Sequence, residues 1–311
     1  MIQQASGSPV IPGFDEALLA RLDAGARSER VRAARAEALR AYLELPAPHT
    51  GLEEWRRTDP ARLPFGRWPA LGRPEVVPSG PEGAWDEAFD VVVTITEDRL
   101  CVRDVTGALA RGEVVAMPLD EAAERFPDPA ARFLAGDARG VGSTKFEALS
   151  DVFWNAGVYV LVPDGVALGK GVLIRHAYGR GEFVTVPRLV VAAGERSRAR
   201  MVEHLTSPDG VPLLAVMCKE MYLDAAALLN FVSIQDWGAS SFHVSNDWAQ
   251  IARDAQVHWI TVNLGAGLSK MKFGSDAAGP GASAELDGVY FAGADQHVDQ
   301  RTLQVHSAPH T

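Results

Sequence analysis

Hydrophobic residues recur at helical spacing near the start of the chain. Residues 14–45 are rich in Ala, Leu, Arg and Glu, which are good helix formers. Apolar positions such as Phe14 and Leu18 recur at loosely helical intervals. Gly25 can divide this stretch, and Pro46 ends it because proline has no amide hydrogen to donate. The pattern predicts one or two helices over residues 14–45.

Three segments of different character follow. Residues 46–86 are rich in Pro, Gly and Trp and predict irregular structure. Residues 89–118 alternate short apolar runs with polar turns, which predicts a small sheet. Residues 119–139 again have a helical pattern. We therefore expect residues 1–146 to form one α+β region.

The pattern changes near residue 150. From Val158 onward, Val-, Ile- and Leu-rich runs of about four to seven residues alternate with Gly, Asp and Pro turns, and a helix is possible only around 223–229. Small or polar corners recur at intervals of roughly 27–32 residues, which is a repeat signature. The corner positions are Gly165, Ser197, Asp224, Asp254 and Gly281.

Short strands with regular corners suit a β-helix, in which each coil stacks on the next. A β-sandwich or a double-stranded β-helix would also give short strands. The repeat length and the lack of hairpin signals favour the solenoid. We therefore predict a mainly β fold, with a parallel β-helix over residues 147–311 after the α+β region.

Composition adds limits on function. Of the 311 residues, 47% are hydrophobic and 23% charged, as in globular proteins, and the formal net charge is −10. The acidic balance argues against a nucleic-acid-binding surface. The first residues lack the basic start of a secretory signal, and no apolar run approaches the roughly 20 residues that span a membrane. Cys101 and Cys218 give neither a disulfide framework nor metal-site spacing, so we expect reduced thiols in a cytoplasmic protein.

No sequence motif for catalysis is present. The GKG at 169–171 lacks the phosphate-loop pattern, and no G-x-S-x-G or H-E-x-x-H occurs, so we expect a protein that is not an enzyme. His297, His306 and His310 lie near two aspartates, a combination that could bind a metal. We favour hydrogen bonding or a subunit contact for these three and predict no metal site. The other strand histidines, His204, His243 and His258, are expected to be structural.

Four segments resemble the SufB/SufD family of iron–sulfur cluster assembly proteins, nearer the SufD side. They are LEEWRRTD at 52–59, the stretch from KFEALSDVF to VEHLTSP at 145–208, FVSIQDW at 231–237, and DQHVDQRTLQVHSAPHT at 295–311. The resemblance implies a right-handed parallel β-helix flanked by helical regions. It also implies a scaffold subunit of the SUF machinery that pairs with a SufB-type subunit and a SufC-type ATPase. An iron–sulfur cluster would then be held only transiently in the complex, with no cofactor bound by this chain alone.

Three departures from the family pattern refine this expectation. Leu205 stands where SufB has its sulfur-accepting cysteine, and leucine cannot replace a thiolate. Arg175, Gln235 and Trp237 fall near or on positions that line an interior route proposed for sulfur in SufB. The lysine that follows in SufB is not matched, because Asn246 and Asp247 occupy that stretch. The family pattern also continues past Thr311, into coils and helices that dock the ATPase. We therefore read the chain as C-terminally truncated and expect it not to bind the ATPase by itself.

Two further expectations remain open. An uncapped last coil would pair with missing sequence or with another chain, so a homo-oligomer is possible. The alternative function is a β-helix enzyme acting on acidic polysaccharide. Such an enzyme needs several carboxylates or a Ca²⁺ site in a groove, and no coil offers a clear cluster of this kind.

Overall fold

The computed structural model describes residues 10–135, 144–293 and 295–311. Two helices open this part of the chain, α1 (Glu16–Ala24) and α2 (Glu29–Glu44). The side chain of Asp15 caps the first and that of Ser28 the second, each accepting a hydrogen bond from an amide of the first turn. Gly25 follows α1 directly, so the predicted helical stretch is confirmed with its break at this glycine.

The segment after α2 is irregular, as predicted, before a small sheet forms. It contains the 3₁₀ turns η1 (Glu53–Trp55), η2 (Pro60–Arg62) and η3 (Asp86–Ala88), and the short strand β1 (Glu75–Val77). The small sheet comprises β2 (Val91–Ile95), β3 (Arg99–Asp104) and β4 (Val115–Pro118). Three helices follow, namely α3 (Leu119–Arg125), α4 (Pro127–Ala135) and α5 (Lys145–Phe153). The last residues of the predicted helix over 119–139 lie outside the described residues.

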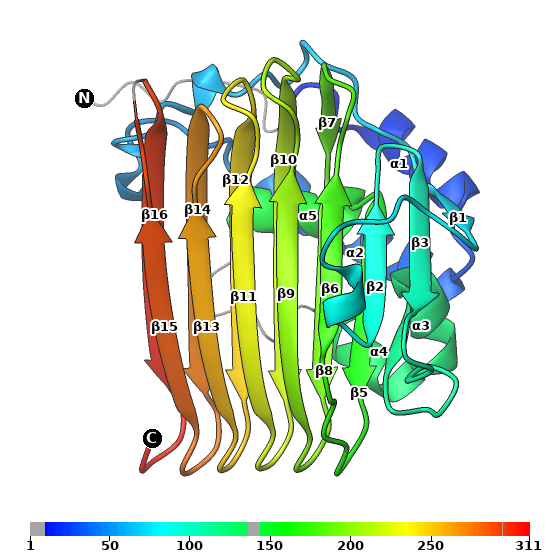
Figure 1. Ribbon diagram of the computed structural model, residues 1–311. Coiled ribbons are helices and arrows are strands. Elements are labelled where there is room, and N and C mark those ends of the chain that lie inside the picture. Colours follow the sequence, from blue (N-terminus) through cyan, green and yellow to red (C-terminus); the bar gives the residue numbers. More distant parts are fainter. Residues whose placement is uncertain (1–9, 136–143, 294) are drawn as a thin grey trace.

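The second half consists of strands. They are β5 (Ala156–Val162), β6 (Val172–Ala177), β7 (Phe183–Thr185), β8 (Pro187–Ala193), β9 (Arg198–Thr206), β10 (Leu213–Leu223), β11 (Leu228–Asp236), β12 (Phe242–Ile251), β13 (Gln256–Asn263), β14 (Leu268–Ala277), β15 (Ser283–Tyr290) and β16 (His297–His306). They form two facing sheets that wind into a solenoid (Figure 1). One sheet has the order β1-β3-β2-β6-β9-β11-β13-β15, and the other β16-β14-β12-β10-β8-β5-β4 with β7 beside β10.

Successive coils pair in parallel, so the predicted parallel β-helix is confirmed. Cys218 of β10, for example, pairs with Arg188 of β8 on one side and with Asn246 of β12 on the other. The antiparallel pairs β2–β3 and β4–β5 lie at the start of the solenoid. The sheets therefore grow coil by coil from the α+β region toward β15 and β16, which are the outermost strands of the two sheets.

A left-handed backbone conformation marks one edge of every coil. The residues concerned have φ between 58° and 74°, about 30 residues apart, and are Gly165, Arg196, Ala226, Asp254, Gly281 and His310. The amides of the first five donate to a backbone carbonyl in the next corner over 2.8–3.0 Å. This hydrogen-bonded stack of corners explains the recurrence that the sequence shows.

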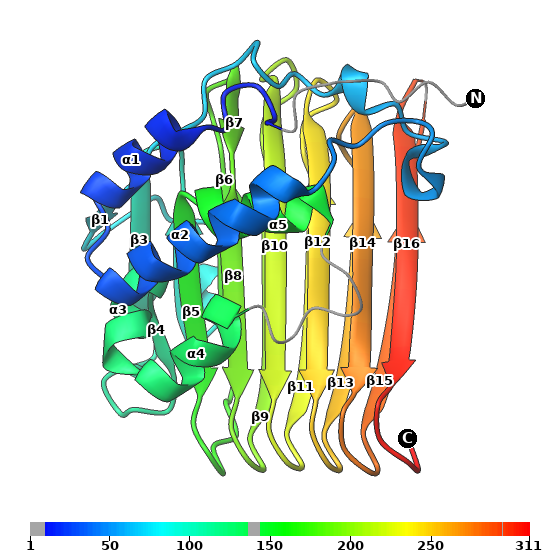
Figure 2. The same cartoon turned by 180° about the vertical axis from the view of Figure 1, so that it is seen from behind.

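Apolar side chains fill two separate layers. One core lies between the two sheets and includes Ile174, Val191 and Trp259. The other lies between the helices and the outer face of the β8–β10–β12 sheet, where Phe153 and Val216 belong to one cluster. Figure 2 shows α2 and α5 crossing this face. The other sheet is not covered by these helices.

Two details differ from the sequence expectations. Residues 223–229 form no helix, because Leu223 ends β10, a corner follows, and Leu228 begins β11. Helix α5 was not predicted, and it runs across the expected boundary between residues 146 and 147. Its capping box pairs Thr144 with Glu147, a signal that the sequence does contain.

Candidate functional site

Charged side chains meet inside the solenoid, between the two sheets. Glu203 projects from β9 in one sheet, and Lys219 and Asp247 project from β10 and β12 in the other. The three side chains are at most 1% exposed. An ion pair that joins opposite sheets at this burial must lie in the interior. We call Glu203, Lys219 and Asp247 the interior triad.

Hydrogen bonds fix the interior triad. The Lys219 ammonium lies 2.6 Å from Oε2 of Glu203 and 3.2 Å from Oδ2 of Asp247. Ser233 donates to Glu203 over 2.8 Å, and Ser245 donates to Asp247 over 2.5 Å. The backbone amide of Lys219 also donates to Oδ1 of Asp247 over 3.0 Å. Charge-assisted bonds of this kind offset part of the cost of burying three ionisable groups.

The environment shifts the pKa of each group. Burial opposes ionisation of Glu203, yet the neighbouring Lys219 ammonium and His176 bring its pKa well below the ordinary value. Burial also opposes the charged form of Lys219, but the two carboxylates raise its pKa. Burial dominates at Asp247 and raises its pKa. Lys219 and Glu203 are thus held as a charged pair, with Asp247 as the more readily protonated partner.

Two histidines border the interior triad. His176 of β6 places Nε2 3.6 Å from Oε1 of Glu203, and His243 of β12 is fully buried. Neither ring nitrogen of either residue has a hydrogen-bond partner within 10–135, 144–293 and 295–311. Burial, together with the Lys219 charge, lowers the pKa of His243 to about 3. His243 is therefore neutral at physiological pH, as a structural histidine would be.

The structure places two of the predicted lining residues in the interior. Gln235 accepts hydrogen bonds from the amides of Gly265 and Trp237, and donates to the Gly265 carbonyl over 3.1 Å. The Gln235 side chain therefore links two consecutive coils by hydrogen bonds. Trp237 is buried and stacks on Tyr178, with ring centroids 5.6 Å apart. The hydrogen bonds of Gln235 and the ring stacking of Trp237 are contacts within the coils.

Arg175, the third predicted lining residue, faces outward. Its guanidinium pairs with Asp86 of the η3 turn and contacts Thr94 of the neighbouring strand β2. Its register partner, His204, lies against the ring of Trp85, the residue before η3. Side chains alternate along a strand, so the residue that faces the interior is the next one, His176. The lining role of Arg175 stays a prediction, and the side chain of this strand that reaches the interior is His176.

His297 joins two of the family-like segments. Thr58, from the 52–59 segment, lies 2.9 Å from Nε2 of His297 and donates to Asp299 over 2.6 Å. Lys270 adds a 2.7 Å ion pair to Asp299 and donates to the carbonyl of Glu54. His297 thus has partners within its own chain, which sequence reasoning did not find because they are about 240 residues away.

The other two predicted contact histidines lie at the end of the last coil. Nδ1 of His306 is 2.8 Å from the hydroxyl of Thr311, and both residues are exposed. His310 adopts φ of 61°, and its carbonyl accepts a 2.9 Å hydrogen bond from the amide of Gly281. His310 is therefore part of the corner stack. Whether any of the three histidines contacts another subunit stays a prediction.

The residues considered for sulfur chemistry are all buried. Cys101 lies in β3 and Cys218 in β10, which belong to different sheets. Burial raises the pKa of the Cys101 thiol, which opposes formation of a reactive thiolate. Leu205 is fully buried in an apolar cluster with Tyr178 and Trp237. The position that carries a thiol in SufB is therefore a packed hydrocarbon side chain here.

Comparison with known proteins agrees with this geometry. Residues 176–311 match the model of the family described as SUF system FeS cluster assembly, SufBD core domain. An iron-sulfur cluster assembly SufBD family protein of Mycobacterium tuberculosis is 40% identical over 90 residues, which is 29% of this chain and 23% of the relative. Relatives with the same description come from Pyrococcus horikoshii (24% over 191 residues, 61% and 43%) and Staphylococcus saprophyticus (23% over 168 residues, 54% and 36%).

The fold and the interior define a class of protein, a parallel β-solenoid with a charged, hydrogen-bonded core. The comparisons support a protein of the SufB/SufD type, because the core-domain model matches the chain from His176, at the end of β6, to Thr311. The matched stretches cover less than half of each of these three relatives. Within the described residues, no helix is long and apolar enough to cross a membrane.

Proposed function

We propose that this chain is a non-catalytic scaffold subunit for iron–sulfur cluster assembly in the cytoplasm, pairing with a SufB-type subunit. The observation that carries the proposal is the core-domain match over residues 176–311, from the end of β6 to the end of the chain. A scaffold role needs a rigid platform rather than a reactive centre. The corner stack and the interior triad provide that rigidity.

The interior supports a role without sulfur transfer by this chain. Its most polar part is occupied by a paired ammonium and two carboxylates. Leu205 packs in the apolar cluster beside it. The sulfur acceptor and the ATPase activity would then belong to the partners, a SufB-type subunit and a SufC-type ATPase.

Anaerobic reconstitution with Fe²⁺ and sulfide tests this proposal. The chain alone should develop no cluster absorbance after gel filtration, whereas a mixture with the SufB-type subunit should retain a cluster. The variant C101A/C218A is the control, because the proposal predicts that it behaves as the wild type in both experiments. A stoichiometric cluster on the isolated chain that disappears in this variant would overturn the proposal.

The comparisons do not support the alternative of a polysaccharide-acting enzyme, because the matching family model and relatives are described as iron–sulfur cluster assembly proteins. Release of uronate from pectin by the purified chain would revive it.

A further inference from the structure

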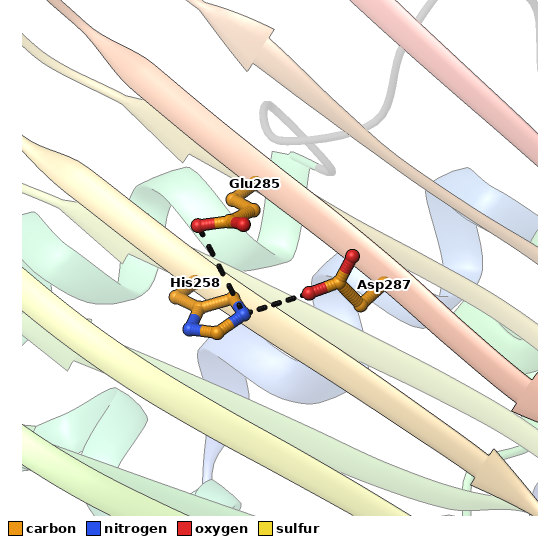
Figure 3. Close-up of side chains that lie close together, drawn as sticks. All are labelled: His258, Glu285 and Asp287. Carbon is orange, nitrogen blue, oxygen red and sulfur yellow. Dashed lines mark hydrogen bonds and ion pairs between the residues drawn. The ribbon is translucent and has the colours of Figure 1, made fainter.

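Three metal-ligating side chains converge on the outer face of the sheet that the helices leave uncovered. His258 lies on β13, and Glu285 and Asp287 lie on β15 (Figure 3). The parallel register places Glu285 directly beside His258. Asp287 is two residues further on, so it projects from the same face of the strand. The solenoid repeat thus brings together residues that are nearly 30 positions apart in the sequence.

The spacing of the donor atoms fits a single cation. Nε2 of His258 lies 2.9 Å from Oδ2 of Asp287 and 4.0 Å from Oε2 of Glu285. One ligand atom from each residue can be chosen so that all three lie within 4.8 Å of one another. Ligand atoms about 2.1 Å from a tetrahedral ion are about 3.4 Å apart. The three donors therefore approach the separations of a bound ion before any rearrangement.

The charge of this cluster is not balanced. His258 is the ion-pair partner of both carboxylates, and no lysine or arginine of the described residues pairs with Glu285 or Asp287. The next register positions across the sheet are Asn230 and then Arg200, which is two strands away from His258. Two carboxylates beside a single imidazole leave net negative charge, which a cation would neutralise.

We propose that His258, Glu285 and Asp287 form an exchangeable site for a divalent first-row transition ion of the Zn²⁺ or Fe²⁺ type. An imidazole with two carboxylates suits such ions, whereas Mg²⁺ and Ca²⁺ favour ligand sets made only of oxygen. The side chains are 37%, 70% and 54% exposed, so the ion is open to solvent and to exchange. The site is separate from the interior triad and does not depend on the proposed scaffold role.

Titration calorimetry with Zn²⁺ on chelator-treated protein tests the site. The wild type should bind one equivalent at this cluster, and H258A should weaken that binding at least tenfold. The double variant E285Q/D287N should do the same, because it keeps the side-chain shapes and removes both charges. H306A, which removes another exposed histidine of the same solenoid, is the matched control and should bind as the wild type does. Thermal unfolding of the four proteins without metal checks that the surface substitutions leave the fold intact.

The nature of the ion is tested by competition. Anaerobic Fe²⁺ should displace Zn²⁺ from the wild type when added in excess, and equimolar Ca²⁺ should not. Wild-type protein that fails to bind Zn²⁺ even at millimolar concentration would overturn the site. Unchanged binding by H258A would overturn it equally, and displacement by equimolar Ca²⁺ would overturn the assignment to a transition ion.

Discussion

Replacing Lys219 by methionine tests whether the interior triad holds the two sheets together. The substitution keeps the length of the side chain and removes its charge. Glu203 and Asp247, neither exposed to solvent, would then remain without their shared cation. Removing one partner of a buried ion pair costs about 3–5 kcal/mol, because the remaining charge stays desolvated.

The assay is equilibrium unfolding in urea at pH 7, followed by circular dichroism. K170M is the control, since Lys170 is exposed and its ammonium donates to the carbonyl of Glu87 at the surface. Surface substitutions of this kind change the free energy of unfolding by about 0.5 kcal/mol or less. The triple variant K219M/E203Q/D247N should recover part of the loss, because it leaves no buried charge unpaired.

The loss caused by K219M should depend on pH. The pKa of Glu203 is lowered in the folded wild type, so its contribution is present above the pKa of the unfolded carboxyl group and is lost as the pH falls. Without Lys219 this contribution disappears, and protonation then relieves the buried charge. The difference between wild type and K219M should therefore shrink from pH 7 to pH 4. A K219M protein as stable as K170M at pH 7 would refute the reasoning.

Further predictions concern other parts of the chain. The pKa of His243 is lowered to about 3 in the folded protein, so between pH 6.5 and 3 the unfolded state takes up a proton that the folded state does not. The free energy of unfolding of the wild type should therefore fall with pH in this range, and H243L should reduce that slope by up to about 1.4 kcal/mol per pH unit. Ala226 has φ of 59°, a left-handed conformation that glycine adopts easily and valine does not. In urea unfolding, A226G should therefore be at least as stable as the wild type, and A226V should lose about 1–2 kcal/mol of unfolding free energy. Equal urea midpoints for the two variants would contradict this. T58A should speed proteolysis within residues 46–86 several-fold, since Thr58 ties this segment to His297 and Asp299; unchanged cleavage would show that other contacts anchor it. Mass spectrometry after incubation with a persulfide donor should detect no sulfur added to this chain, while a SufB-type subunit in the same tube is labelled.

The solenoid was predictable because its signals are local and repeated. Each corner contains a small or polar residue near a left-handed position, and each strand is a short apolar run. The sequence therefore indicated the coils at Gly165, Asp254 and Gly281, where the structure has its corners. Helix α5 was missed because Lys145–Phe153 is a single short amphipathic stretch next to the first strand run.

The site residues were less predictable, because side-chain direction depends on strand register. A shift of one residue reverses the face of a strand, and this separates Arg175 on the outside from His176 inside. The interior triad joins strands of opposite sheets, and the cluster at His258 joins adjacent coils. Neither grouping has a sequence motif, since the partners are set by how many residues each coil contains. Gln235 lies in the FVSIQDW segment, and its side chain is buried in the coil.

The central proposal is that this chain pairs with a SufB-type subunit as one half of a scaffold. Size-exclusion chromatography with light scattering on an equimolar mixture with the cognate SufB-type subunit tests it most directly. The account predicts one species with the summed mass of the two chains, and K170M should form it as readily as the wild type. Two separate peaks at the masses of the individual chains, at concentrations well above those in the cell, would contradict it.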